Sequence, residues 1–107
     1  MSPAILLLLA IVSEVIGTVL LRVSDGMSKL APSLGMLAAY GLSVYLLALV
    51  LKHMEIGFAY AVWAGVGTAM IAVIGVFAWD EPMGLIKILS IGAVIVGVIG
   101  LNLSGAH

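Results

Sequence analysis

The sequence contains no cysteine and very few charged side chains. Without cysteine, the chain forms no disulfides, Cys-ligated zinc sites, iron–sulfur clusters or thiol nucleophiles. Charged residues make up 8% of its 107 residues and hydrophobic residues 64%, against about 25% and about 45–50% in soluble proteins. So few charges cannot cover a water-soluble fold, and we expect lipid to be the main solvent. A net charge of −1 without a basic cluster argues against a nucleic-acid partner.

The charged residues divide the chain into four long apolar segments. Residues 3–21 contain one charge, Glu14, and uncharged runs of 22, 24 and 20 residues begin at Leu30, Ile56 and Ile88. A membrane-spanning helix needs about 20 mostly apolar residues, and continuous rather than alternating runs argue against a β-barrel. We therefore predict an all-α membrane protein, a single four-helix transmembrane domain over residues 1–107, with helices at about 3–21, 33–51, 57–79 and 85–104.

The predicted connections are short, so neighbouring helices run antiparallel. Arg22, Lys29 and Lys87 then lie on one side of the membrane and Lys52 lies on the other. Orientation follows the excess of Lys and Arg in the loops. Because the excess is small, insertion in both orientations is compatible with the sequence.

Glu14 lies near the middle of the first predicted span. It follows Pro3 by eleven residues, or about 16 Å of a hydrocarbon core about 30 Å thick. An acid at this depth costs about 2.5–3.5 kcal/mol to insert, and we expect no Lys, Arg or His of the other spans to neutralise it. Glu14 is then either protonated or beside a mobile cation, which makes an antiport site. The alternative is a hydrogen bond between helices without a transport role.

Small residues flank Glu14 on its face of the first helix and leave room for a bound cation. We predict a proton- and substrate-binding site that comprises Glu14, its neighbours Leu7, Ala10, Gly17 and Thr18, and Ser43 with three aromatic residues of the next two helices. At 100° per residue, that face comprises Leu7, Ala10, Glu14, Gly17, Thr18 and Leu21. The corresponding stripes of the second and third helices are Tyr40, Ser43 and Leu47, and Tyr60, Trp63 and Gly67. Because aromatic faces attract organic cations, Tyr40, Tyr60 and Trp63 predict the walls of a cation site. Their alternative role is to anchor helices at the membrane interface.

Small residues also mark the third and fourth predicted helices. Gly65-Val66-Gly67 lies in the middle of the third, where paired glycines allow either a bend or close packing. In the fourth helix, small residues recur every three or four positions at Ser90, Ala93, Gly97, Gly100 and Ser104. We call this set the small-residue seam. It suits close helix approach, and we favour self-association over packing within the monomer because four helices barely enclose a site.

Three motifs carry a resemblance to a known family. Glu14 to Thr18 (EVIGT), Ala59 to Gly67 (AYAVWAGVG) and Leu101-Asn102-Leu103 together resemble the small multidrug resistance family of bacterial transporters. The resemblance covers essentially the whole chain. It implies a multi-pass protein of the bacterial inner membrane, an antiparallel dual-topology homodimer that exchanges hydrophobic cations for protons.

The resemblance also implies roles for individual residues. Glu14 would bind proton and substrate in turn, and the aromatic pocket would comprise Tyr40, Tyr60 and Trp63. Gly65 and Gly67 would let the third helix flex, and the small-residue seam would form the dimer contact. Some relatives work as heterodimers, but the weak charge bias favours a homodimer. Ala64 and Ser90 depart from the Ser and Gly that other members carry there.

Two positions bear on the substrate. Guanidinium exporters of the family usually carry Trp shortly after the acid and Lys near the chain's end, where this sequence has Gly17 and Asn102. We therefore expect a proton-coupled antiporter that exports quaternary ammonium and other hydrophobic cations. Guanidinium export and a non-transporting membrane scaffold are the alternatives. The predicted spans contain no nucleophile–base pair or metal cluster, so we expect no enzyme activity, no cofactor and no metal.

Overall fold

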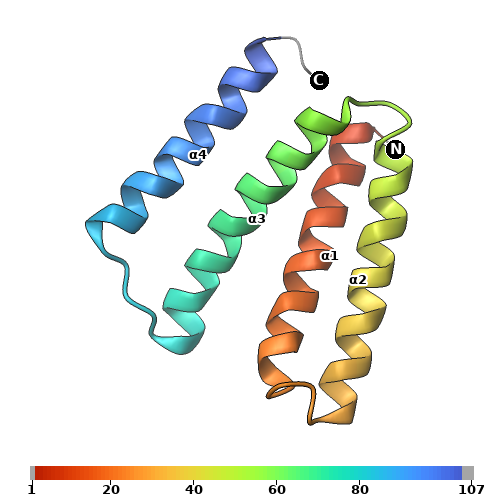
Figure 1. Cartoon of the computed structure of the whole chain (residues 1–107), viewed down its shortest axis with the longest axis vertical. Coiled ribbons are helices and arrows are strands. Elements are labelled where there is room, and N and C mark those ends of the chain that lie inside the picture. The colour runs from red at the N-terminus through yellow and green to blue at the C-terminus, as the bar shows by residue number, and fades with distance from the viewer. Residues whose placement is uncertain (1, 105–107) are drawn as a thin grey trace. The chain divides into compact units, whose positions relative to one another are not determined.

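The structure, a computed structural model, describes residues 2–104 and forms four α-helices over that range. They are α1 (Pro3–Val23), α2 (Leu30–Val50), α3 (Ile56–Trp79) and α4 (Leu85–Leu103) (Figure 1). Each helix is long and apolar enough to cross a membrane. The predicted all-α architecture with four membrane-spanning helices is therefore confirmed.

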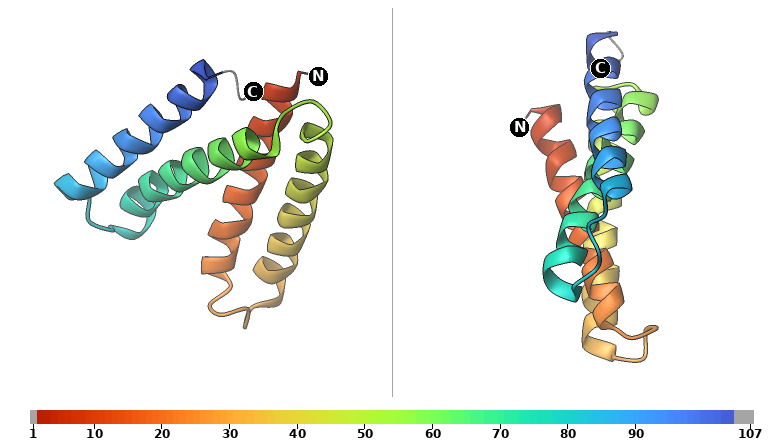
Figure 2. Two further views of the ribbon diagram at one scale, coloured as in Figure 1. Left: turned by 45° about the horizontal axis from the view of Figure 1, so that its top comes forward. Right: turned by 90° about the vertical axis from the view of Figure 1, so that its left-hand side faces the viewer.

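The chain divides into two compact units, Met1–His53 and Met54–His107. Each unit is a helical hairpin, one built from α1 and α2 and the other from α3 and α4 (Figure 2). The prediction of a single domain over residues 1–107 is not tested by this division and stays a prediction.

In the first hairpin, α1 packs along the length of α2 and two buried serines bond across the contact. The Ser13 hydroxyl donates to the Ala39 carbonyl, and the Ser43 hydroxyl donates to the Ala10 carbonyl, each at 2.8 Å. The two bonds run in opposite directions, one from each helix. Lipid gives helices no hydrophobic reason to associate, so such hydrogen bonds and close packing are what hold membrane helices together. They fix the register of α1 against α2.

A tight turn joins α1 to α2, and Ser24 organises it. Asp25, Gly26 and Met27 have φ angles of 51°, 71° and 67°, in the left-handed region. The Ser24 side chain is fully buried; it donates to the Leu21 carbonyl at 2.6 Å and accepts the Met27 N–H at 3.0 Å. Left-handed geometry costs non-glycine residues about 1–2 kcal/mol each, and these bonds offset part of that cost.

The second helix begins at Leu30, three residues before the predicted start at position 33. We expected Pro32 to precede the helix, but proline is tolerated within a first helical turn because the N–H it lacks has no intrahelical acceptor there. Lys29 is the N-cap residue, and its carbonyl accepts both the N–H and the hydroxyl of Ser33. The first charge-free residue of the segment is therefore also the first residue of the helix.

In the second hairpin, α3 contacts α4 through a glycine. A Cβ atom at Gly65 would lie 2.6 Å from the Val94 Cγ1 atom and 3.3 Å from the Val98 Cγ2 atom. The absence of a side chain at Gly65 thus lets the two helices approach. Contact elsewhere is sparse, and no residue of α4 is buried.

The third helix ends in a left-handed cap. Asp80 has a φ of 52°, and the N–H groups of Asp80 and Glu81 both donate to the Gly75 carbonyl. The Glu81 carboxylate folds back over Gly75, in the space that a Cβ atom would need. The connection then runs through Pro82 to the N-cap residue Gly84, so α4 begins at Leu85.

Candidate functional site

The Glu14 carboxylate lies in the middle of α1 and is half-buried. Its Oε1 atom accepts a hydrogen bond from the Thr18 hydroxyl at 3.1 Å. Thr18 lies one helical turn after Glu14, so the two side chains share one face of the helix. The structure thus brings together two residues that the sequence placed on one stripe.

Tyr40 of α2 completes this polar group. Its hydroxyl lies 2.8 Å from the Thr18 hydroxyl, although the two residues are 22 positions apart in the chain. Gly17 makes the approach possible, because a Cβ atom there would lie 2.6 Å from the Cδ1 and Cε1 atoms of the Tyr40 ring. Glu14, Thr18, Tyr40 and Gly17 therefore form one cluster across the α1–α2 contact, which we call the Glu14 cluster.

No cationic side chain of the first hairpin lies at the depth of Glu14 among residues 2–53. Arg22 lies in the last turn of α1, Lys29 caps α2, and Lys52 follows α2. Arg22 follows Glu14 by eight residues, or about 12 Å along the helix axis. Lys87, in the second hairpin, lies in the first turn of α4. The Glu14 carboxylate is thus hydrogen-bonded to a neutral hydroxyl, and the basic residues of its hairpin lie at the helix ends.

Three predicted site residues of the first hairpin are buried. Leu7 and Ala10 are buried, with 4% and 0% of their surfaces exposed, and Ser43 is 1% exposed. The Ser43 hydroxyl already donates to the Ala10 carbonyl. Ala10 and Ser43 thus join the two helices, and a role of all three residues in cation binding stays a prediction.

The other predicted site residues lie in the second hairpin. Tyr60 is 71% exposed, Trp63 is half-buried, and Gly65 and Gly67 are buried. Gly65 permits close packing against α4, which is one of the two roles that the sequence allowed for the glycine pair. The aromatic-wall role of Tyr60 and Trp63 and the flexing role of Gly65 and Gly67 stay predictions.

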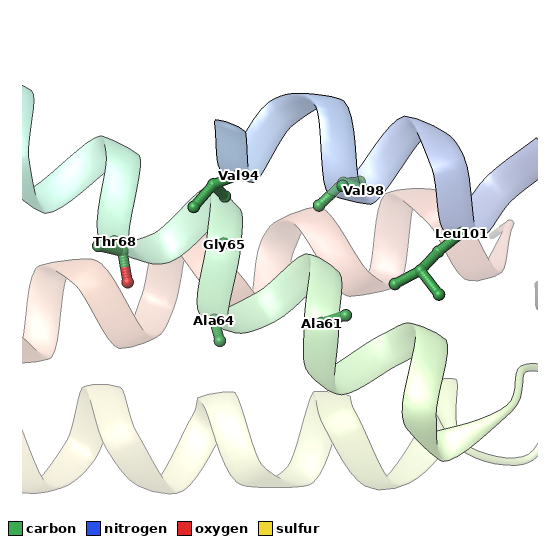
Figure 3. A pocket seen from close by; sticks show the side chains of 8 residues that line it. Ala61, Ala64, Gly65, Thr68, Val94, Val98 and Leu101 are labelled. Carbon is green, nitrogen blue, oxygen red and sulfur yellow. The ribbon is translucent and has the colours of Figure 1, made fainter. Parts of the chain in front are cut away.

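An open, apolar groove follows the contact between α3 and α4. Its volume is about 410 Å³, and Figure 3 shows Val94, Val98 and Leu101 of α4 pointing toward α3 along it. A second groove of about 180 Å³ continues toward Lys87 and Ser90. All members of the small-residue seam are exposed, namely Ser90, Ala93, Gly97, Gly100 and Ser104. Within the second hairpin none of them is buried, although Gly97 lines the first groove and Ser90 the second.

The sequence pattern did not identify two buried serines that hold the first hairpin together. Ser13 and Ser24 are buried and hydrogen-bonded; a polar residue inside a long apolar run was the available signal for Ser13. In the part of the chain that the structure describes, no group of three or more His, Asp or Glu side chains is placed to hold a metal ion.

The chain is similar to a known family of proteins over most of its length. The family model for the Small Multidrug Resistance protein matches residues 3–103. The multidrug resistance protein Mmr of Mycobacterium tuberculosis is 42% identical over 102 residues, which cover 94% of this chain and 95% of that protein. The quaternary ammonium compound-resistance protein QacC of Staphylococcus aureus is 41% identical over 103 residues, 96% of each chain. The uncharacterized membrane protein YvaE of Bacillus subtilis is 44% identical over 99 residues, 92% of this chain and 83% of that protein.

These matches extend over all four helices, including the Glu14 cluster. The resemblance carried by the three sequence motifs is therefore confirmed, as is the prediction of a multi-pass membrane protein without enzyme activity. The chain belongs to the small multidrug resistance family of membrane transporters.

Proposed function

We propose that this transporter exports hydrophobic cations, quaternary ammonium compounds among them, in exchange for protons, and that Glu14 binds either guest in turn. The observation that supports this most strongly is the setting of Glu14. It is a mid-span carboxylate whose hydrogen-bond donor is a neutral hydroxyl, with the basic residues of its hairpin at the helix ends. A charge in that position needs a proton or a cationic guest, and ionisable residues within membranes mark transport pathways by default.

The relatives support the choice of substrate class. QacC is named for resistance to quaternary ammonium compounds and Mmr for multidrug resistance. Such cations are apolar around the charge, so a site for them needs a counter-charge and apolar or aromatic walls. Glu14 supplies the counter-charge in this proposal, and Tyr40, Tyr60 and Trp63 supply the aromatic faces.

The contact between Gly17 and Tyr40 argues against guanidinium export, the alternative within the family. By the family resemblance, guanidinium exporters carry Trp shortly after the acid, where this chain has Gly17. Even a Cβ atom at position 17 would come within 2.6 Å of the Tyr40 ring. The Tyr40 ring could therefore not keep its present position if a Trp side chain stood at position 17.

We further propose that two copies assemble as an antiparallel homodimer through the small-residue seam. The seam is exposed, and a Cβ atom at Gly97 or Gly100 would meet no other atom of the described chain within 4 Å. Small residues at this spacing let helix backbones approach closely. The two copies would then bring two Glu14 carboxyl groups into one assembly. A heterodimer with a related chain is the alternative.

Transport in liposomes tests the proposal. With an inward proton gradient, the chain should drive counterflow of a quaternary ammonium cation and leave guanidinium unmoved. Glu14→Gln should abolish this flux, because a neutral amide binds neither guest. Glu14→Asp, which keeps the charge on a shorter side chain, is the matched control and should retain part of the flux.

Two results would contradict the proposal. Undiminished proton-driven flux in Glu14→Gln would remove Glu14 from the mechanism. Faster flux of guanidinium than of the quaternary ammonium cation would reverse the assignment of substrate class.

A further inference from the structure

The Thr18 hydroxyl stands at the centre of the Glu14 cluster, within hydrogen-bond distance of three oxygen atoms. The Glu14 Oε1 atom and the Glu14 main-chain carbonyl each lie 3.1 Å away, and the Tyr40 hydroxyl lies 2.8 Å away. A hydroxyl group has one proton to donate and two lone pairs with which to accept. The protonation state of Glu14 therefore decides how the three bonds are used.

When Glu14 is ionised, its carboxylate can only accept hydrogen bonds. Thr18 then donates its single proton to the Glu14 Oε1 atom, and the Tyr40 hydroxyl donates to Thr18. The bond from Thr18 to the carboxylate is charge-assisted, so it is roughly twice as strong as a bond between neutral groups. The donor from Tyr40 polarises Thr18 and strengthens that bond further.

When Glu14 is protonated, the same atoms form hydrogen bonds with donor and acceptor exchanged between Glu14 and Thr18. The carboxylic acid donates to Thr18, and the Thr18 proton turns to the Glu14 main-chain carbonyl, one helical turn back. Such bonds from Thr to the preceding turn are common in helices. The second lone pair of Thr18 still accepts from Tyr40. No heavy atom has to move, because only hydroxyl protons rotate.

We propose that Thr18 is a positioning residue for Glu14, which holds the carboxyl group in one place in both protonation states and couples it to the hydroxyl of Tyr40 on α2. The inference deepens the proposed function and rests on it, since it concerns the exchange of proton and cation at Glu14. It assigns Tyr40 an action on Glu14 that passes through Thr18.

The packing of the hairpin supports a direct action of Thr18 on Glu14 and an indirect action of Tyr40 through Thr18. The ring of Tyr40 lies against the backbone of Gly17, which directs its hydroxyl to Thr18. Among the described residues of the hairpin, α2 carries no charged side chain and its other titratable group, Tyr45, is exposed. Arg22, Lys29 and Lys52 stand at helix ends. Within the hairpin, the Thr18 hydroxyl is thus the nearest group able to discriminate between the two states of Glu14.

The test measures binding of benzyltriethylammonium, an aromatic quaternary ammonium cation, to the purified full-length protein by calorimetry between pH 5 and pH 9, a range of about 4 pH units around the working pH of an acid–base site. The readout is the pH at which binding falls to half of its plateau. Thr18→Val keeps the shape of the side chain and removes the hydroxyl. It should move this midpoint upward by about half to one pH unit, because the ionised carboxylate loses more than the protonated one.

Three further variants separate positioning from structure. Thr18→Ser should restore the midpoint, because it restores the hydroxyl. Thr68→Val makes the same change at an exposed position of α3 and should leave the midpoint in place. Tyr40→Phe keeps the aromatic ring and should give a smaller upward shift, which should disappear when it is combined with Thr18→Val.

Each failure has its own meaning. If the unaltered chain binds the cation with no dependence on pH, the proposed function is wrong and the inference fails with it. If binding depends on pH but Thr18→Val keeps the original midpoint, the inference alone is overturned. It is also overturned if Thr18→Val binds nothing at any pH while Thr18→Ser binds normally, since the hydroxyl would then contact the cation. Equal shifts for Tyr40→Phe with and without Thr18 would show that Tyr40 acts independently and would refute the coupling.

Discussion

The two hairpins have similar lengths and compositions but are held together differently. Of the most apolar stretch of each helix, 33% is buried in α1 and 0% in α4. Hydroxyl groups bond across the first hairpin at Ser13, Ser43 and Thr18. The close contact of the second is a glycine against two valines. Hydrophobicity alone therefore does not decide which membrane helices pack; the placement of hydroxyl groups and small residues does.

The difference suits two distinct tasks. The first hairpin carries the Glu14 cluster, and its cross-helix bonds fix the register of α1 against α2, on which the contact between Thr18 and Tyr40 depends. The second hairpin leaves the small-residue seam exposed, so its surface is available to lipid or to a second copy. Matched substitutions in the two hairpins should therefore separate a hairpin that is stable by itself from one that depends on its surroundings.

The largest effect should come from the same truncation made once in each hairpin. Ile11→Ala removes a side chain that is 1% exposed, and the cavity it leaves should lower the free energy of unfolding by about 2 kcal/mol or more. Ile95→Ala removes one that is 50% exposed and should cost less than about 0.5 kcal/mol. Both can be measured by reversible unfolding in mixed micelles. Equal losses of unfolding free energy in the two variants would mean that a partner covers α4, and the proposed difference between the hairpins would be wrong.

An intermediate effect should come from filling the contact of the second hairpin. Gly65→Ala places a methyl group 2.6 Å from the Val94 Cγ1 atom, and such overpacking should destabilise the protein by about 1–3 kcal/mol. Gly92→Ala is the matched control, because a Cβ atom there would meet nothing within 4 Å; it should be neutral or stabilising by up to about 1 kcal/mol. The same unfolding assay applies. A neutral Gly65→Ala would show that α3 and α4 separate easily.

The smallest effect on the chain itself should come from the small-residue seam. Gly97→Ala adds a methyl group with no described neighbour within 4 Å, so its unfolding free energy should change by less than about 0.5 kcal/mol. The proposed dimer should nevertheless weaken, because the backbones could no longer approach as closely. Crosslinking in liposomes at several protein-to-lipid ratios would measure the dimer fraction. An unchanged fraction would move the dimer contact away from Gly97.

Much of the fold could be predicted because charge is so costly in lipid. The positions of the few charged residues gave the four spans, and three of the four helices begin within one residue of the predicted start. The exception is α2, where the start depends on whether Pro32 lies before the first turn or within it. Proline is compatible with both positions, so composition could not distinguish them.

The site could be predicted in outline but not in its bonds. The helical repeat placed Glu14, Gly17 and Thr18 on one face, and the structure adds that Tyr40 reaches Thr18. That contact depends on how far α2 is shifted along α1. The shift is set by Ser13 and Ser43, whose acceptors are main-chain carbonyls that leave no trace in a side-chain pattern. The helical repeat of the sequence therefore predicts which side chains share a face of one helix, but not which groups of the next helix they bond.

The main-chain acceptors of those two serines have a consequence for how the protein changes over generations. The carbonyls at positions 10 and 39 are present whichever amino acid stands there. Replacements that fit the space can then alter the lining near the carboxylate while the serines keep their bonds. The packing of the first hairpin and the side chains around the Glu14 carboxylate can therefore be changed separately by mutation.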